Sequence, residues 1–345
     1  MKKTLLFLIV LFLTNGIRTY SQCAIEAGDN KTIICGGSVQ LDAQPKWVIT
    51  SSSVSALLNS VYYTTTDTGY AVGNGGAILK TSNAGSSWIW LSSITTNNLN
   101  SVYFTDKNTG YAVGENGYIT KTSNAGTTWT ALISGTSNIL NSVKFTNDST
   151  AYAVGQNGII LKTINYGTTW TAQTTTVYLS SVYFIDTDTG YAVGANGRII
   201  KTTDAGTNWT ILTSGVIYSL RSVYFTDSIT GYAVGVNGLI LKTTNAGTTW
   251  TQQTSGTTNY FTSVHFINTD TAYAVGYGGL LLKTIDAGTT WAALTSGTSK
   301  TLRSVYFTDA NNGYAAGDSV TVIIKLSQPV SYAWTPSTGL DTKIG

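Results

Sequence analysis

The residue types that most often carry enzyme chemistry are sparse in this sequence of 345 residues. It contains one histidine, His265, and two glutamates, Glu26 and Glu115. A zinc site with several histidines is therefore excluded, and a nucleophile–histidine triad would have to use His265. The two cysteines, Cys23 and Cys35, form no CxxC pair. Because His265 stands where other copies of a repeated motif carry tyrosine, we interpret it as a packing residue. We expect no catalytic residue, no metal and no cofactor.

Arginine side chains offer a second kind of chemistry, the recognition of anions. Beyond residue 22 the chain has three of them, Arg198, Arg221 and Arg303. The planar guanidinium group fits carboxylate, phosphate and sulfate. Arg221 and Arg303 open the first strand of two repeated units, and Arg198 follows a turn between a second and a third strand. Strand geometry then directs all three toward one rim, which we treat as a hypothetical ligand-binding face. The alternative, that they only aid solubility, stays open.

Carboxylates and lysines recur at fixed places in the repeat. Turn chemistry explains most aspartates, because an Asx side chain bonds the backbone of its own turn; they are Asp67, Asp106, Asp186, Asp188, Asp227, Asp270 and Asp309. The lysines are interpreted as solvated strand ends with their stems over tryptophan, or else as a basic ring for an anionic partner. This series consists of Lys80, Lys121, Lys162, Lys201, Lys242 and Lys283.

The elements that hold these residues follow from an internal repeat. A Ser-Val motif followed by one or two aromatic residues begins at Ser60, Ser101, Ser142, Ser181, Ser222, Ser263 and Ser304, at intervals of 39 or 41 residues. Tyr-Ala-Val-Gly recurs with the same period, and so does Lys-Thr-x-Asn/Asp-x-Gly-x-x-Trp. Units of about forty residues are typical of propeller blades. No window beyond the N-terminal segment has a sustained helical period, so we predict an all-β chain.

Each unit is expected to form four short strands. In the second unit these are residues 101–105, 111–114, 118–122 and 129–132, with a tight turn at Asn116-Gly117 that needs positive φ. The last unit lacks the motif's tryptophan, whereas Trp47 lies 41 residues before Trp88 and has no unit of its own. We therefore predict a seven-bladed β-propeller in which the N-terminal strand around Trp47 completes the last blade and closes the ring.

The third motif carries a family resemblance. Thr122-Ser123-Asn124-Ala125-Gly126-Thr127-Thr128-Trp129 resembles the Asp-box, or BNR, repeat, and the whole unit is similar to propellers of the photosystem II stability/assembly-factor type. The resemblance covers roughly residues 47–326. It implies that the box is a structural turn, in which Asn or Asp bonds the local backbone, Gly adopts positive φ and Trp packs between blades. The box residues are Asn83, Asn124, Asn165, Asp204, Asn245 and Asp286, with Trp88, Trp129, Trp170, Trp209, Trp250 and Trp291.

The flanks indicate further modules. Residues 1–22 have a basic start and an apolar stretch too short to span a bilayer, so they are predicted to be a cleaved signal peptide. Residues 23–46 and 327–345 resemble the two parts of a split Ig- or PKD-like sandwich of secreted Bacteroidetes-type surface proteins, with the propeller of residues 47–326 inserted between them. The second part looks truncated. The redox state of Cys23 and Cys35 stays open.

An enzymatic alternative comes from Asp-box sialidases, to which such propellers are related. A sialidase-like site needs three arginines, a tyrosine nucleophile with a glutamate beside it, and an aspartic acid. The ring lacks a glutamate to activate a tyrosine, because Glu115 lies in a turn and Glu26 in the flank. The glycosidase therefore remains only an alternative.

Composition completes the expectation. A net charge of +3 with 10% charged residues leaves no electrostatic footprint for nucleic acid. We expect a secreted or cell-surface, monomeric, non-catalytic ring without a membrane span, which binds or displays a protein or an anionic glycan. An assembly factor that chaperones a partner protein is the third alternative.

Overall fold

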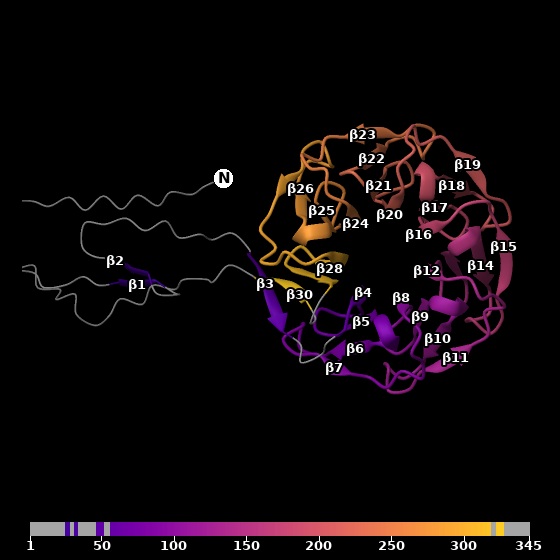
Figure 1. Cartoon of the computed structure of the whole chain (residues 1–345), viewed down its shortest axis with the longest axis horizontal. Helices are drawn as coiled ribbons and strands as arrows, with labels where there is room; N and C mark the ends of the chain where they lie inside the picture. Colours follow the sequence, from indigo (N-terminus) through magenta and orange to yellow (C-terminus); the bar gives the residue numbers. More distant parts are fainter. Residues whose placement is uncertain (1–24, 28–30, 34–45, 52–55, 319–321, 328–345) are drawn as a thin grey trace, which may run out of the picture. The chain divides into compact units, whose positions relative to one another are not determined.

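The computed structural model describes residues 25–27, 31–33, 46–51, 56–318 and 322–327. The chain divides into two units, Trp47–Ser327 and a second one that comprises Met1–Lys46 with Gln328–Gly345. The first unit is a ring of four-stranded antiparallel sheets around a central channel (Figure 1). No helix among the described residues is long and apolar enough to cross a membrane.

Four kinds of strand recur, from the channel outward (Figure 1). The innermost strands are β4 (Leu58–Tyr63), β8 (Leu99–Phe104), β12 (Leu140–Phe145), β16 (Leu179–Phe184), β20 (Leu220–Phe225), β24 (Phe261–Phe266) and β28 (Leu302–Asp309). The second strands are β5 (Gly69–Gly73), β9 (Gly110–Gly114), β13 (Ala151–Gly155), β17 (Gly190–Gly194), β21 (Gly231–Gly235), β25 (Ala272–Gly276) and β29 (Asn312–Gly317). The third strands are β6 (Ile78–Thr81), β10 (Ile119–Thr122), β14 (Ile159–Thr163), β18 (Ile199–Thr202), β22 (Ile240–Thr243), β26 (Leu281–Thr284) and β30 (Val322–Ser327). The outermost strands are β7 (Ile89–Trp90), β11 (Thr130–Leu132), β15 (Thr171–Thr174), β19 (Thr210–Leu212), β23 (Thr251–Gln253), β27 (Ala292–Ala293) and β3 (Lys46–Ser51).

The sheets differ in how they are assembled from the chain. Six of them, from β4–β7 to β24–β27, consist of four strands that are consecutive in sequence. A further four-stranded sheet has the order β28–β29–β30–β3, so the strand that contains Trp47 pairs at its outer edge. Trp47 is buried there against Tyr273 and Phe307, with ring centroids 5.8 Å away in both cases. The N-terminal strand thus completes a sheet whose other strands come from the C-terminal end of the ring.

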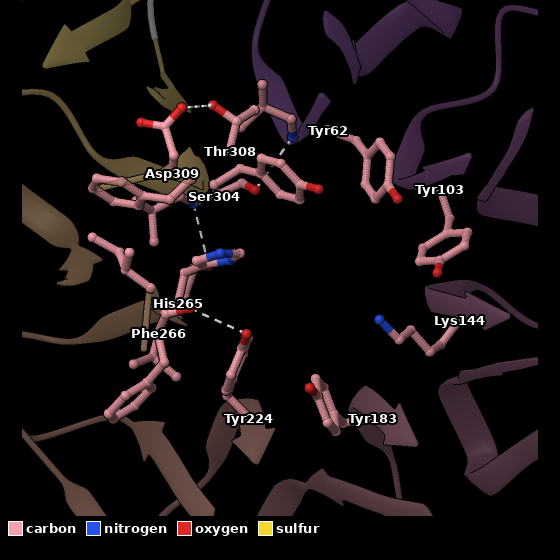
Figure 2. Close-up of a pocket in the computed structure, with 17 residues that line it drawn as sticks. Tyr62, Tyr103, Lys144, Tyr183, Tyr224, His265, Phe266, Ser304, Thr308 and Asp309 are labelled. Carbon is pink, nitrogen blue, oxygen red and sulfur yellow. Dashed lines mark hydrogen bonds between the residues drawn. The ribbon is translucent and has the colours of Figure 1, made fainter. Parts of the chain in front are cut away.

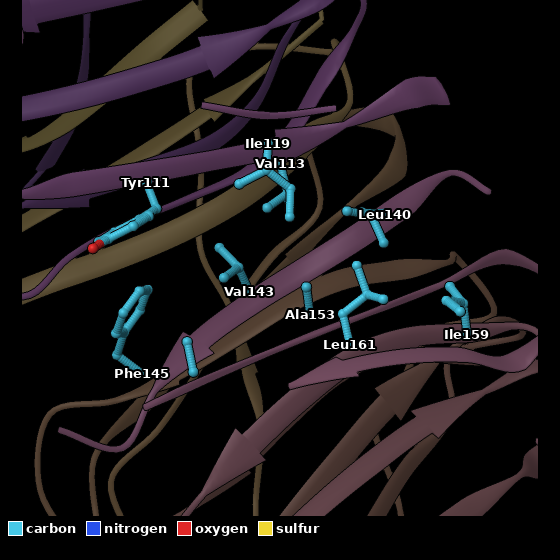
Figure 3. Packing of buried hydrophobic residues seen from close by; sticks show 10 residues of the cluster. Tyr111, Val113, Ile119, Leu140, Val143, Phe145, Ala153, Ile159 and Leu161 are labelled. Atoms are coloured by element: carbon cyan, nitrogen blue, oxygen red, sulfur yellow. The ribbon is translucent and has the colours of Figure 1, made fainter. Parts of the chain in front are cut away.

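The hydrophobic core lies between neighbouring sheets. Tyr111 and Val113 of β9 pack with Leu140, Val143 and Phe145 of β12 in the next sheet (Figure 3). The second strand β9 is buried along its whole length, which explains why its sequence is a continuous run of small and apolar residues. Glycine ends these strands because a Cβ on Gly114 would meet the carbonyl oxygen of Asn98 at 1.9 Å.

Turns between second and third strands are short 3₁₀ segments in five of the sheets. They are η1 (Asn74–Gly76), η2 (Glu115–Gly117), η3 (Gln156–Gly158), η4 (Ala195–Gly197) and η5 (Tyr277–Gly279). Asn116 and Gly117 have φ of 56° and 65°, so the predicted positive-φ turn is confirmed there. The innermost strand of this unit begins at Leu99, two residues before the predicted start, because Leu99 pairs with Gly114 across a β-bulge.

The predicted fold class needs a correction outside the ring. There the described residues form one two-stranded sheet of β1 (Ile25–Ala27) and β2 (Lys31–Ile33). A sandwich needs two sheets packed face to face, and strands of three residues present too little surface for that. The prediction that the propeller is inserted into a split Ig- or PKD-like sandwich is therefore wrong for the part of the chain that the structure describes. Residues 1–22, Cys23, Cys35 and residues 328–345 lie outside the described residues.

Candidate functional site

The Asp boxes form turns between third and outermost strands, and their side chains are engaged in these turns. Asn124 Oδ1 accepts a 2.9 Å bond from the backbone N–H of Thr128, and Thr122 Oγ1 accepts one of the same length from Gly126. Gly126 has φ of 82°, and Trp129 is buried in a cluster that joins two sheets. In a charged version of the box, the hydroxyl and backbone N–H of Thr290 lower the pKa of Asp286 to about 2.

The lysine series holds neighbouring blades together. Lys80 Nζ donates a 2.9 Å hydrogen bond to the carbonyl oxygen of Ala125, in the Asp box of the next blade. The hydroxyl of Tyr70 donates to the same oxygen, also at 2.9 Å. The ammonium group lies 5.5 Å from the Tyr70 ring, so the expected partner, tryptophan, is replaced by tyrosine. Equivalent lysine bonds are made by Lys121, Lys162, Lys201 and Lys242, while Lys283 lies over Tyr273. These contacts favour the structural interpretation over a basic ring.

The three arginines lie at one end of the ring, which we call the arginine face. Arg221 and Arg303 are the second residues of β20 and β28, at the bulge of each strand. Arg198 directly follows η4, and its carbonyl oxygen accepts a bond from Gly194, which pairs with the first residue of β16. Their environments differ. Arg303 forms an ion pair with Asp318, whereas Arg221 is exposed.

The channel carries a ring of side chains whose role sequence reasoning missed. Each innermost strand contributes the residue after its Ser-Val pair. Figure 2 shows six of these side chains directed into the open middle of the channel, those of Tyr62, Tyr103, Lys144, Tyr183, Tyr224 and His265. We call this set the channel ring; it consists of Tyr62, Tyr103, Lys144, Tyr183, Tyr224, His265 and Tyr306. They border a cavity of about 470 Å³. A signal for it existed in the sequence, since lysine and histidine interrupt a position that otherwise holds tyrosine.

Neighbours in the channel ring touch all the way round. Tyr224 and Tyr306 lie on either side of His265, with ring centroids 5.3 Å and 5.0 Å from its ring. On the other side of the channel the Lys144 ammonium group lies 4.9 Å from the Tyr103 centroid and 5.1 Å from that of Tyr183. The hydroxyls of Tyr62 and Tyr224 donate to the carbonyl oxygens of Phe104 and Phe266 at 3.0 and 3.1 Å. These two phenols are therefore fixed by backbone contacts.

The channel shifts the titration of its basic groups. Burial lowers the pKa of Lys144 to about 8. Burial, with the charge of Lys144 as a second cause, lowers the pKa of His265 to about 4, against a backbone hydrogen bond with Phe307 that raises it. Burial raises the pKa of Tyr306 to about 12 and raises that of Tyr183 as well. At neutral pH the channel ring therefore carries one positive charge, on Lys144, and a neutral imidazole.

Residues needed for glycosidase or metal chemistry are not brought together in the described part of the chain. Glu115 accepts a 2.9 Å bond from Asn98 in the turn η2, and no glutamate lines the cavity around the channel ring. Four of the seven turn aspartates act as expected; Asp106 Oδ1, for example, accepts bonds from the backbone N–H groups of Asn108 and Thr109. In the turns that contain Asp67, Asp188 and Asp270, the accepting side chain is instead that of Thr65, Asp186 or Asn268. No cluster of three or more His, Cys, Asp or Glu suited to a metal ion occurs among the described residues.

Comparisons with known proteins agree with this geometry. Four overlapping stretches, 81–177, 122–216, 171–256 and 212–302, match the family model described as photosynthesis system II assembly factor YCF48. A search of curated proteins found no match.

Among solved structures, one of "YCF48 bound to D1 peptide" is similar with a TM-score of 0.72 and 18% identity, covering 83% of this chain and 98% of that one. The structure of YCF48 from Cyanidioschyzon merolae has a TM-score of 0.70 and 17% identity, and the match covers 82% of this chain and 98% of that one. The WD40 repeats of RRP9 also give 0.70, at 7% identity and over the same shares of the two chains, so these likenesses show the fold alone. The family match spans more than half of the sequence, and the chain therefore belongs to the family of the photosynthesis system II assembly factor YCF48.

Proposed function

We propose that this chain is a non-catalytic propeller that binds a segment of a protein partner on its arginine face, in an assembly role. Membership of the assembly-factor family supports such a role. One structural neighbour is a propeller bound to a peptide, so this fold accommodates peptides. The observation that carries the proposal is a patch of exposed tyrosines at the same end of the ring as the exposed Arg221.

This patch, which we call the tyrosine patch, consists of Tyr218, Tyr260 and Tyr277. Their exposed fractions are 46%, 41% and 47%, and the rings of Tyr260 and Tyr277 lie 5.5 Å apart. Tyrosine and arginine are enriched among residues that dominate protein–protein binding, because they combine apolar area with directional hydrogen bonds. An exposed group of them is therefore suited to a protein segment.

Backbone hydrogen bonds connect the patch across two blades. The backbone N–H of Val236 donates a 3.0 Å hydrogen bond to the carbonyl oxygen of Ser219. Ser219 lies between Tyr218 and Arg221 in the sequence. In the same β21–β22 turn, the backbone N–H of Gly238 donates a 2.9 Å bond to the carbonyl oxygen of Asn259. The backbone N–H of Tyr277 donates a bond of the same length to the carbonyl oxygen of Tyr260. The tyrosines and Arg221 thus sit on turns that are bonded to one another, which gives the patch a fixed backbone.

The charge of the face indicates the kind of segment. Arg303 is neutralised by Asp318, whereas Arg221 forms no ion pair with the carboxylates of the described residues. An acidic side chain flanked by aromatic or aliphatic residues would match Arg221 and the tyrosine patch. An anionic glycan is the competing ligand, and it would depend on the arginine more than on the tyrosines.

We also propose that the protein acts outside the cytoplasm, as a secreted or surface protein. The basic start Met1-Lys2-Lys3 and the apolar residues that follow support export with removal of the first 22 residues or so. Sequencing the N-terminus of the protein released by the cells that produce it tests this. An intact Met1 in the mature protein would contradict it.

The binding proposal is tested with a random library of 12-residue peptides selected on the wild-type protein. Affinities of the selected peptides are then measured for wild type, Arg221→Gln, Tyr260→Ala and the control Lys283→Gln. We expect a loss of about tenfold or more for the first two variants, corresponding to roughly 1.4 kcal/mol, and no change for the control. Heparin and sialyllactose are tested alongside. Saturable binding of either glycan without any peptide binding would overturn the proposal.

A further inference from the structure

The channel ring contains a charged group that the proposed function does not use. Lys144 belongs to β12 and occupies a strand position at which the other innermost strands carry tyrosine or histidine. Its ammonium group is directed into the cavity (Figure 2). It forms no ion pair with the carboxylates of the described residues. Its neighbours are the faces of Tyr103 and Tyr183. A desolvated cation held by aromatic rings alone can still accept an anionic partner.

We propose that the central channel is a second binding site, which takes a small aromatic monocarboxylate with its carboxylate on Lys144. The ring systems of the site lie side by side around the channel, with centroids of neighbouring rings about 5 Å apart, as for Tyr62 with Tyr103 and with Tyr306. Such walls offer the offset and edge contacts that a flat ligand ring prefers. The cavity of about 470 Å³ falls within the range of small-molecule pockets.

The charge balance of the cavity fixes the charge of the ligand. Lys144 supplies one positive charge. His265, across the channel, has a pKa of about 4 and is therefore neutral at neutral pH. Asp309 also lines the cavity and repels a second carboxylate. A monoanion is therefore matched, whereas a dianion is opposed by Asp309 and a neutral amide leaves the ammonium group without a partner.

This site is separate from the arginine face. Channel-ring residues occupy the fifth position of the innermost strands, and the cavity extends from the third position, Ser263 and Ser304, to Asp309 at the end of β28. No arginine of the described residues lines it. Arg221 and Arg303 occupy the second position, at the start of their strands. Loss of binding in the channel can therefore be distinguished from loss of binding on the arginine face.

The test uses benzoate as the probe and benzamide as its neutral counterpart, with titrations by calorimetry or NMR on the whole chain. The key variant is Lys144→Tyr, which introduces the residue that most innermost strands carry and should fold. We expect saturable benzoate binding to wild type, at least tenfold weaker binding to Lys144→Tyr, and at least tenfold weaker binding of benzamide. Lys144→Arg should stay within threefold of wild type.

A matched control is Lys283→Gln, since Lys283 also lies over a tyrosine ring, 5.4 Å from the Tyr273 centroid, but outside the channel ring. Benzoate binding should be unchanged in this variant and in Arg221→Gln. Binding should also weaken as the pH rises through about 8, where Lys144 loses its proton. The groups that face it are Tyr62, Tyr103, Tyr183, Tyr224, His265, Tyr306 and Asp309. No saturable benzoate binding, or equal affinities for wild type and Lys144→Tyr, would overturn the proposal.

Discussion

The backbone N–H of Val61 donates a 3.2 Å hydrogen bond to Oγ of Ser304, a residue 243 positions later in the sequence. The first and last innermost strands are joined by the same bond that joins their counterparts elsewhere in the ring. Equivalent bonds run from Val102 to Ser60, Val143 to Ser101, Val182 to Ser142, Val264 to Ser222 and Val305 to Ser263. This explains the recurrence of the Ser-Val pair, because serine accepts from the valine of the following blade.

Closure of the ring also depends on the strand that contains Trp47. Deletion of residues 23–52 removes β3, and with it the packing of Trp47 on Tyr273 and Phe307. Loss of a buried tryptophan costs about 3–5 kcal/mol, which should lower the melting temperature by roughly 10 °C. Deletion of residues 23–45 keeps β3 and serves as the control. Equal melting temperatures for the two deletions, measured by circular dichroism, would show that β3 does not close the ring.

The Asp box should respond to substitution as a structural turn. Gly126→Val forces a side chain into a backbone with φ of 82° and brings Cβ to 2.7 Å from Cδ1 of Leu91. Gly135 has a similar φ of 76° but open space around it, so Gly135→Val isolates the backbone strain. We expect a loss of about 1–2 kcal/mol for Gly135→Val and a clearly larger one for Gly126→Val in urea unfolding. If the folded Gly126→Val protein lost peptide binding at unchanged stability, the box would be functional instead.

Lys144 should make stability depend on alkaline pH. Its pKa is lowered from 10.5 to about 8 on folding, so the unfolded chain binds more protons between these two values. The free energy of unfolding therefore rises with pH from about 8 to 10.5, by about 3 kcal/mol. Lys144→Met lacks this gain. Wild type should be less stable relative to Lys144→Met below pH 8 than above pH 10, and a constant difference would contradict the shifted pKa.

His265 has the corresponding effect in acid. Its pKa falls from 6.5 to about 4 on folding, because burial disfavours the imidazolium form. Stability is then lost as the pH falls from about 6.5 through 4, where the unfolded chain takes up the proton first. His265→Tyr, which carries the residue of the neighbouring strands, should remove this part of the acid sensitivity. If the urea midpoints of unfolding of the two proteins fell by the same amount between pH 7 and pH 4, the result would argue against a buried neutral histidine.

The repeat made much of the ring predictable from the sequence. The period placed the four strands of each unit, and the distance from Trp47 to Trp88 identified a strand without a unit of its own. The arginine end also followed from strand order, because turns between second and third strands meet the starts of innermost strands. Asn124 could be assigned to its own turn for the same local reason.

The channel ring could not be predicted in this way. A β-bulge lies between the first and third residues of each innermost strand, for example Leu140 and Ser142, and changes which residues share a face. Simple alternation therefore does not show that Lys144 faces the channel. The contact of Lys80 with Ala125 spans two blades and depends on how sheets pack side by side. Such features depend on tertiary geometry, which residue spacing along one blade does not contain.

The most direct test of the central claim, that the arginine face binds a protein partner, is site-specific photo-crosslinking in the cells that produce the protein. A benzoylphenylalanine replaces Tyr260 on the arginine face or, as the control, Tyr166, which is 55% exposed in an Asp box at the other ends of the strands. We predict one discrete crosslinked protein from position 260, lost when Arg221→Gln is added, and none from position 166. Equal crosslinking from both positions, or crosslinking at 260 that persists without Arg221, would contradict the account.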